Sequence, residues 1–198
     1  TGRKQAEGEI QRERAFFDRL VESAPEGIAI ADTQGRIMRV NAEFVRMFGY
    51  GVDEVVGQYL DDLVVPPARQ EEAKALTRST IQGEKNLLET VRRRKDGTLV
   101  DVSLIGASIL VAGKQEAVYA IYRDITDRKR AEEALRASEM RYRTFINATS
   151  DLVFLKDESF RYLMSNEANN SFLGASEGNV IGRTDFDLMP NEAAEHCR

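Results

Sequence analysis

Few residues of this 198-residue chain have side chains that could carry out catalysis. His196 is the single histidine and Cys197 the single cysteine, and both stand near the C-terminal end. A nucleophile needs a base within hydrogen-bond reach, and histidine is the commonest such base. The sequence shows no nucleophile–base pair, no metal-ligand cluster and no phosphate-binding loop, and its carboxylates fall mainly on helix faces. We therefore expect a chain that is not an enzyme.

The stretch Asp124-Ile125-Thr126 could instead carry mechanical coupling, because it stands between a predicted strand and a predicted long helix. Ile125 can pack where sheet meets helix, while Asp124 and Thr126 can form hydrogen bonds across the junction. A shift of the sheet would then tilt the outgoing helix. The alternative, that Asp124 and Thr126 only cap the start of this helix, stays open and is compatible with the first role.

Two long helices are predicted on either side of the middle of the chain. Residues 4–23 carry an apolar stripe that ends before Pro25, and residues 128–145 lack glycine and proline and are rich in Ala, Glu, Arg and Leu. A period of seven places Leu135 and Tyr142 on one line. This pattern predicts a weakly packed coiled-coil dimer seam or, alternatively, ordinary surface helices. The seam residues would be Ile10, Phe17, Leu20, Ala131, Leu135, Ser138 and Tyr142.

The chain matches itself when it is displaced by 125 residues. Asn41 falls on Asn166 and Gly57 on Gly182, and the apolar positions between them agree in kind. A fixed period of this length indicates a repeated domain rather than a short solenoid unit. We expect one complete domain followed by the first half of a second copy, cut at Arg198, and a further domain upstream in the parent protein.

The composition predicts a soluble globular protein, with 42% hydrophobic and 31% charged residues. The net charge of −5 argues against a general nucleic-acid surface, and the run Arg92-Arg93-Arg94-Lys95 is interpreted as a solvated hairpin end. A single cysteine rules out an internal disulfide and fits a reducing, cytoplasmic compartment. No apolar run reaches the roughly 18–20 residues of a membrane span, so no membrane contact is expected within this segment.

Between the long helices, the pattern predicts two strands, several short helices and then three strands. The predicted ranges are strands at 27–32 and 36–40, a helix at 42–48 that Asn41 caps and Gly49 ends, a helix at 68–81, and strands at 87–94, 98–110 and 117–123. Lys95-Asp96-Gly97 is a strong hairpin signal. A five-stranded antiparallel sheet with short helices on one face satisfies this order, which is an α+β fold.

Four landmarks in this order carry a resemblance to a known family. They are Asn41 at the start of the first short helix, the stop at Val55-Val56-Gly57, the Lys95-Asp96-Gly97 hairpin and Asp124-Ile125-Thr126 after the last strand. The chain resembles the PAS family of sensory modules, in full over 17–126 and as a first half over 142–198. The resemblance implies a PAS fold with a small cavity between sheet and helices, and a role in signal transduction within histidine kinases or cyclic-dinucleotide enzymes.

We accordingly expect an N-terminal signalling helix (1–24), a complete PAS domain (25–126), a coiled-coil-like linker helix (127–147) and the first half of a second PAS domain (148–198). The expected function is that of a sensor module in a two-component sensor histidine kinase. The module would be a homodimer through its helices and would relay a ligand- or partner-induced change to an output domain. The alternatives are a segment of a diguanylate cyclase or phosphodiesterase, and a ligand-free dimerisation module.

Some members of this family hold haem or flavin. Haem needs an axial ligand, usually histidine, and the first domain contains none, which argues against haem there. Light-sensing flavin relatives use a cysteine shortly after the Gly57 position, where this chain has Gln58-Tyr59-Leu60, so covalent flavin chemistry is excluded. His196 stands near the place of the ligand in haem-binding relatives, but beside Glu195 on a polar helix it is expected to be solvated. The cofactor, if there is one, stays unknown.

A small-molecule pocket in the first domain should lie between its sheet and its helices. Asn41, Thr80, Ser103 and Tyr119 are the candidates for polar contacts to a ligand. The alternative is that the apolar candidates simply fill the core. The candidate pocket residues are Ile30, Asn41, Phe44, Met47, Phe48, Leu63, Leu76, Val102, Leu104 and Tyr119.

Overall fold

The computed structural model describes residues 2–195, and the chain forms two compact units that divide between Arg130 and Ala131. The division falls within helix α6 (Thr126–Asn147). Over residues 2–195, none of the helices combines the length and the apolar character that crossing a membrane would require.

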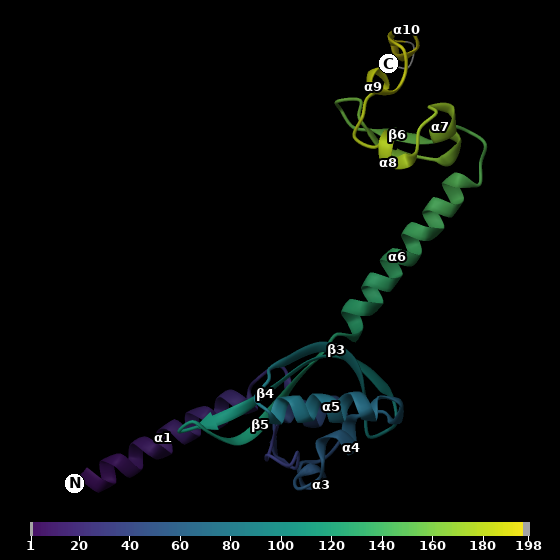
Figure 1. The fold of residues 1–198 in the computed structure, drawn as a ribbon. Helices are drawn as coiled ribbons and strands as arrows, with labels where there is room; N and C mark the ends of the chain where they lie inside the picture. The colour runs from purple at the N-terminus through teal and green to yellow at the C-terminus, as the bar shows by residue number, and fades with distance from the viewer. Residues whose placement is uncertain (1, 196–198) are drawn as a thin grey trace. The chain divides into compact units, whose positions relative to one another are not determined.

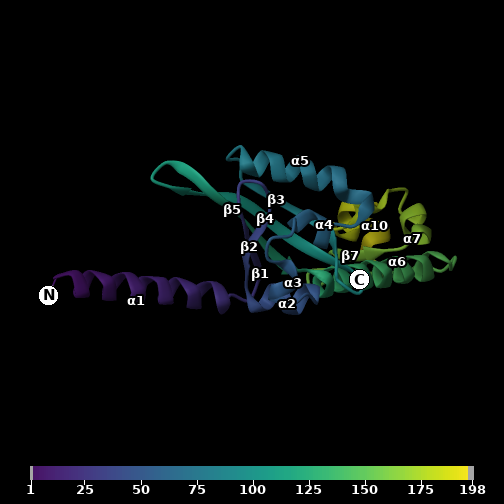
Figure 2. The ribbon, with the colours of Figure 1, turned by 90° about the horizontal axis from the view of Figure 1, so that it is seen from below.

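A five-stranded antiparallel sheet forms the centre of the first unit (Figure 1). In space its strands run in the order β2-β1-β5-β4-β3, and their bounds are β1 Gly27–Ala31, β2 Ile37–Val40, β3 Asn86–Arg93, β4 Leu99–Val111 and β5 Lys114–Asp124. Figure 2 shows the long β4–β5 hairpin extending beyond the other strands. The predicted α+β class and the predicted five-stranded antiparallel sheet are confirmed.

Short helices connect β2 to β3 and cover one face of this sheet. They are α2 (Ala42–Phe48), α3 (Val52–Val55), α4 (Leu60–Val64), a 3₁₀ turn at Pro67–Arg69 and α5 (Gln70–Ile81), while α1 (Gly2–Glu22) precedes β1. Asn41 caps α2 by accepting the N–H of Phe44, and Gly49 ends the helix in the left-handed region, at φ 77°. Both caps were predicted from the sequence and are confirmed.

The core of the first unit lies between α2 and the inner face of the sheet. Phe44 and Phe48 are fully buried, with ring centroids 4.7 Å apart, and the ring of Tyr122 on β5 lies 5.1 Å from that of Phe48. Aromatic pairs at such distances add to the free energy gained from burial alone. Val55, Val64, Val65, Val100 and Val102 complete the surroundings of these rings as buried side chains.

The prediction that Arg92 belongs to a solvated hairpin end is wrong, because only 2% of this residue is exposed. Side chains alternate between the two faces of a strand, and on β3 the inward positions hold Asn86, Leu88, Thr90 and Arg92. Arg92 stands opposite Val100 of β4, which is itself fully buried. The two-residue period of the strand therefore overrides the local run of positive charge.

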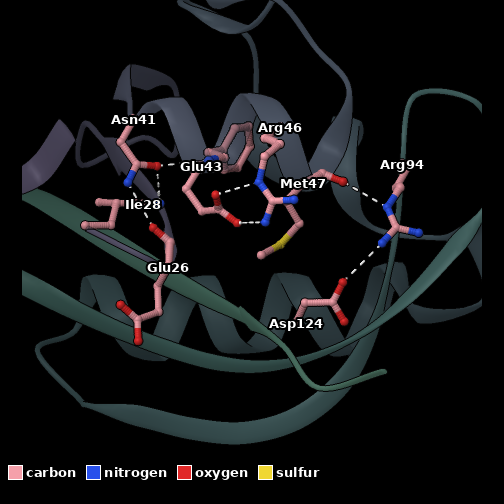
Figure 3. A network of polar contacts seen from close by, with 9 residues as sticks. Glu26, Ile28, Asn41, Glu43, Arg46, Met47, Arg94 and Asp124 are labelled. Carbon is pink, nitrogen blue, oxygen red and sulfur yellow. Dashed lines mark hydrogen bonds and ion pairs between the residues drawn. The ribbon is translucent and has the colours of Figure 1, made fainter. Parts of the chain in front are cut away.

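Asn41 ties three segments of the first unit together through four side-chain hydrogen bonds. Its Oδ1 accepts the N–H groups of Ile28 (2.8 Å) and Phe44 (3.0 Å). Its Nδ2 donates to the carbonyls of Val21 (3.0 Å) and Glu26 (2.9 Å). Figure 3 shows the side chain between the start of β1 and the start of α2. The end of α1, the entry to β1 and the first turn of α2 are therefore held by one amide.

The second unit contains the last part of α6, a two-stranded antiparallel sheet and four short helices. The bounds are β6 Phe154–Lys156, β7 Tyr162–Ser165, α7 Glu167–Phe172, α8 Glu177–Val180, α9 Asp185–Leu188 and α10 Asn191–Glu195. Asn166 accepts the N–H groups of Val153 (3.1 Å) and Asn169 (2.9 Å) and donates to the carbonyls of Ile146 (2.9 Å) and Asp151 (2.8 Å). Each of these partners stands 125 residues beyond the corresponding partner of Asn41.

Candidate functional site

A cavity of about 670 Å³ lies between the inner face of the sheet and α5 in the first unit. Its walls come from β1, β3, β4 and β5 of the five-stranded sheet, from α4 and from most of α5. A volume of this size is within the range of pockets that bind small organic molecules.

Small side chains at inward strand positions make room for this cavity. Ala29 and Ala31 on β1, Gly106 on β4 and Ala120 on β5 all line it, and Ala73 lines it from α5. Protein interiors are otherwise packed as densely as organic crystals, so larger residues at these five positions would fill the space. These small residues thus leave a cavity beside α5, whereas the region around Phe44 is closely packed with aromatic side chains.

The structure brings some of the predicted pocket residues to the cavity and places others elsewhere. Leu76, Leu104 and Tyr119 line the cavity, and so does the polar candidate Thr80. Ile30 lies on the opposite face of β1 from Ala29 and Ala31. The remaining candidates are not cavity-lining residues; they are Asn41, Phe44, Met47, Phe48, Leu63, Val102 and the polar candidate Ser103.

Sequence reasoning missed most of the polar groups of the cavity. Arg92 and Asn86 reach it from β3, and Asp61 and Thr77 reach it from α4 and α5. The amide of Asn86 donates to Ser79 Oγ and Thr80 Oγ1, at 2.8 Å each, which ties β3 to α5. The signal that could have found Arg92 and Asn86 is the two-residue period of β3, which sets both on the face that carries Leu88.

Burial perturbs two acidic groups in the cavity. It raises the pKa of Asp61 above its ordinary value, and a hydrogen bond from Thr77 (2.8 Å) and the positive charge of Arg92 offset part of the rise. Burial also raises the pKa of the Tyr122 phenol, and the guanidinium of Arg92 again acts in the opposite direction. Both groups are therefore harder to deprotonate in the folded protein than in the unfolded chain.

The variant Asp61→Asn is expected to raise the melting temperature at pH 7 by a few degrees. The folded state favours the protonated form of Asp61, so the stability that this group contributes is present below its ordinary pKa and is lost as the pH rises through the raised folded pKa. Asparagine is uncharged at every pH and keeps an oxygen that can accept from Thr77. Thermal unfolding of both proteins between about pH 3 and pH 8 measures the difference, which should vanish at the acidic end.

Asp53 offers the matched control for this experiment, because it is an exposed aspartate that does not line the cavity. The variant Asp53→Asn should differ from the wild type by the same small amount at every pH in the range. A stability difference for Asp61→Asn that does not grow with pH would contradict the assignment of burial as the cause.

The junction between the sheet and α6 is held by a chain of polar contacts (Figure 3). The carboxylate of Asp124 accepts the N–H of Thr126 at 2.8 Å and pairs with the guanidinium of Arg94 at 3.2 Å. Arg94 in turn donates from Nε to the carbonyl of Met47 at 2.9 Å. These contacts connect the end of β5 to the turn after β3 and to α2.

The first turn of α6 is also attached directly to the strands. Ile125 is buried, and its N–H donates to the carbonyl of Asp101 on β4 at 2.9 Å. The ammonium of Lys129 lies 2.7 Å from a carboxylate oxygen of the same Asp101, and Arg128 pairs with Glu89 on β3 at 2.6 Å. The hydroxyl of Thr126 is buried and has no hydrogen-bond partner among residues 2–195, so this residue contributes its N–H to the junction.

The predicted seam residues all lie on α1 or α6. Ile10, Phe17 and Leu20 on α1, and Leu135 and Tyr142 on α6, each expose more than half of their surface. Val21 and Ile146, near the C-terminal ends of the two helices, are buried instead. Both helices therefore carry apolar surface that a second helix could cover.

The single histidine and the single cysteine, His196 and Cys197, lie outside the described residues. Within residues 2–195, no group of three or more His, Cys, Asp and Glu side chains is arranged to hold a metal ion.

Comparison with protein families identifies the fold of the first unit. A family model described as the PAS fold matches residues 15–125. Among solved structures, the PAS domain of a protein from Colwellia psychrerythraea is 26% identical and superimposes with a TM-score of 0.52, over 60% of this chain and 98% of that chain.

Two curated relatives are signalling proteins. The dicarboxylate transport sensor protein DctS of Rhodobacter capsulatus is 31% identical over 140 residues, which are 69% of this chain and 21% of that protein. Sporulation kinase A of Bacillus subtilis is 25% identical over 174 residues, which are 87% of this chain and 28% of that kinase. The chain thus spans between a fifth and a third of the length of these relatives.

Proposed function

This chain belongs to the PAS family, since the family model covers residues 15–125, and from this premise we propose that it is a non-catalytic sensory and signal-relay module of a sensor histidine kinase. Its similarity to a transport sensor and to a sporulation kinase supports a sensory role in signalling. The kinase activity would belong to other parts of the parent protein. The single cysteine favours a reducing compartment, so the proposed location is the cytoplasm.

The observation that carries this proposal is the direct attachment of α6 to the strands that line the cavity. Asp101 on β4 holds the N–H of Ile125 and the ammonium of Lys129, and Glu89 on β3 holds Arg128. The same two strands supply Arg92, Leu104 and Gly106 to the cavity wall, each within a few residues of these contacts. A ligand that moves β3 or β4 would therefore also move the first turn of α6. A relay needs such a coupling between the ligand site and the outgoing helix.

We propose further that residues 148–198 form the first half of a second domain on the same plan, with 25–126 as the complete domain and 127–147 as the linker helix. Four hydrogen bonds around Asn166 reproduce those around Asn41 at a constant displacement of 125 residues. The hairpin that precedes each asparagine agrees as well: Arg161 donates to the carbonyl of Gly182, as Arg36 donates to that of Gly57.

The proposed module acts as a parallel homodimer through α1 and α6. The exposed apolar residues on both helices support this proposal, and the small residues Ala131 and Ser138 in the seam would leave two registers close in free energy. Two nearly equal registers are what a switch requires. Light scattering of the purified chain at tens of micromolar should give a dimer, and a monomer at that concentration would contradict this part of the proposal.

The variant Ser138→Leu is expected to lock one register and to fix the output of the parent kinase at one level. Leucine buries more apolar surface in a seam than serine does, by roughly 2 kcal/mol for each fully buried side chain. Autophosphorylation of the full-length protein, with and without its stimulus, measures the effect.

The matched control is Ala137→Leu, which adds a leucine one residue away and off the predicted seam. It should leave the response unchanged. An unchanged response of Ser138→Leu would count against the relay, and an equal effect of both variants would count against the predicted seam.

A further inference from the structure

The guanidinium of Arg92 is an unusual component of the cavity wall. The residue is 2% exposed, lines the cavity and carries a positive charge at any physiological pH. Buried charges in proteins are normally paired, because an unpaired one loses its hydration without compensation. Among residues 2–195, no carboxylate lies within ion-pair distance of this guanidinium.

The guanidinium of Arg92 interacts with the hydroxyl of Tyr122 and with groups of its own strand, and its Nε is left without a partner among the described residues. Nη1 donates to Thr90 Oγ1 (3.2 Å) and to the carbonyl of Val91 (3.0 Å). Nε is buried and has no hydrogen-bond partner in the described part of the chain. Nε and Nη2 together form the fork that binds both oxygens of a carboxylate in parallel.

The nearby acidic side chains are engaged with other partners. Glu72 accepts from Thr90 Oγ1 at 2.9 Å and pairs with Arg69 at 2.6 Å. Asp61 accepts from Thr77 at 2.8 Å, and burial raises its pKa. Both carboxylates act on Arg92 only through longer-range charge, so its guanidinium keeps the capacity to bind an anion in the cavity.

We propose that the cavity binds a small monocarboxylic acid with an apolar body, and that the Nε side of Arg92 binds its carboxylate. This inference rests on the proposed sensory function, of which it names the ligand class. The apolar body would lie against Ala29, Leu104 and Ala120, which line the same cavity. A second carboxylate on the ligand would approach Asp61, and this disfavours dicarboxylates. Lys74 and Arg78, both exposed residues that also line the cavity, add positive potential that attracts anions.

Isothermal titration of the whole 198-residue chain tests this proposal with benzoate and octanoate as probes. Benzamide serves as the uncharged counterpart, and succinate and inorganic phosphate serve as competing anions. At least one of the two monocarboxylates should bind at least tenfold more tightly than benzamide, succinate and phosphate.

Substitutions in the chain then test which residue binds the carboxylate of the ligand. Arg92→Met should weaken monocarboxylate binding at least tenfold, while Asp61→Asn should strengthen it severalfold by removing an opposing charge. Arg93→Met is the matched control, since Arg93 is the next residue of β3 and does not line the cavity. It should bind as the wild type does. Arg92→Met should also melt at or above the wild-type temperature without ligand, because an unpaired buried charge has been removed.

Each remaining outcome overturns the inference. Equal binding of a monocarboxylate to the wild type and to Arg92→Met would show that Arg92 does not bind the carboxylate. Benzamide binding as tightly as benzoate would show that the cavity does not select carboxylates, although it would still bind a small molecule. No binding of either acid would contradict the proposed ligand class. If Arg92→Met fails to fold, the affinity of Arg92→Gln for the acids and the affinities of the wild type for benzoate and benzamide test the role of Arg92 instead. The relay is tested separately through Ser138, so its failure is distinguishable from failure here.

Discussion

Replacing Asn41 by alanine is expected to lower the free energy of unfolding of the first unit by about 3–5 kcal/mol, because it leaves several buried polar groups unpaired at once. The side chain of Asn41 is 1% exposed and makes four hydrogen bonds, to Val21, Glu26, Ile28 and Phe44. Alanine accepts and donates none of them. Urea denaturation followed by circular dichroism measures the loss.

The variant Asn41→Asp separates the donating half of this side chain from its accepting half. Aspartate has nearly the same shape and still accepts the N–H groups of Ile28 and Phe44, but it cannot donate to the carbonyls of Val21 and Glu26. It should therefore also be strongly destabilised at pH 7, where its charge would face two carbonyl oxygens.

Asn166→Ala is the matched control, because Asn166 makes the equivalent four bonds in the second unit. It should leave the unfolding of the first unit unchanged. If Asn41→Ala costs less than about 1 kcal/mol, the amide does not hold the three segments together as we infer.

Replacing Asp124 by alanine is expected to reduce the stimulus-dependent change in output of the proposed sensor kinase while leaving the first unit folded. Asp124 connects the N–H of Thr126 to Arg94, and Arg94 connects to the carbonyl of Met47. Without this carboxylate, the first turn of α6 loses its polar connection to the turn after β3. The half-exposed ion pair itself should contribute about 1 kcal/mol or less to stability.

In the proposed sensor kinase, autophosphorylation with and without stimulus measures this effect, together with the melting temperature of the 198-residue chain. Asp127→Ala is the matched control, because this carboxylate is fully exposed and lies 3.9 Å from Arg130, which belongs to the same helix. A normal response of Asp124→Ala would show that signals leave the sheet by another route.

The sequence predicted most of the elements of the first unit because their ends carry strong local signals. Asn41, Gly49 and Gly57 stand where the backbone needs a cap or a positive φ, and the structure has them there, at φ 77° for Gly49 and 83° for Gly57. The start of α5 is two residues later than predicted, because Pro67 opens a 3₁₀ turn before the helix. Signals of this kind act within a few residues, so one sequence is enough to find them.

The face that each strand turns to the helices was harder to predict. Ile30 was a predicted pocket residue, yet Gly27, Ala29 and Ala31 hold the inner face of β1. A side chain at position 27 would approach the backbone of Phe44 to 3.2 Å, so any residue larger than glycine would push α2 away by a few tenths of an ångström. That constraint depends on a helix that follows in the sequence, which no pattern within β1 reveals.

Arg92 escaped sequence reasoning for a related reason. Three further basic residues follow it, and such a run usually marks a solvated surface, whereas the period of β3 turns Arg92 inward. A buried charge becomes plausible only when the cavity beside it is known, and the cavity is made by small residues on three other strands. Binding sites of this kind emerge from the tertiary packing.

The way α5 is fastened provides an entry route to the interior. This helix forms one wall of the cavity, and its polar contacts to β3 are side-chain bonds, from Asn86 to Ser79 and Thr80 and from Thr90 to Glu72. The ladder of backbone hydrogen bonds within the sheet does not include it. Displacing α5 would break these side-chain bonds and uncover the buried Ala73, but it would leave every strand pairing intact. Movement of this helix would therefore widen the access of a small molecule to the cavity without any unfolding of the sheet.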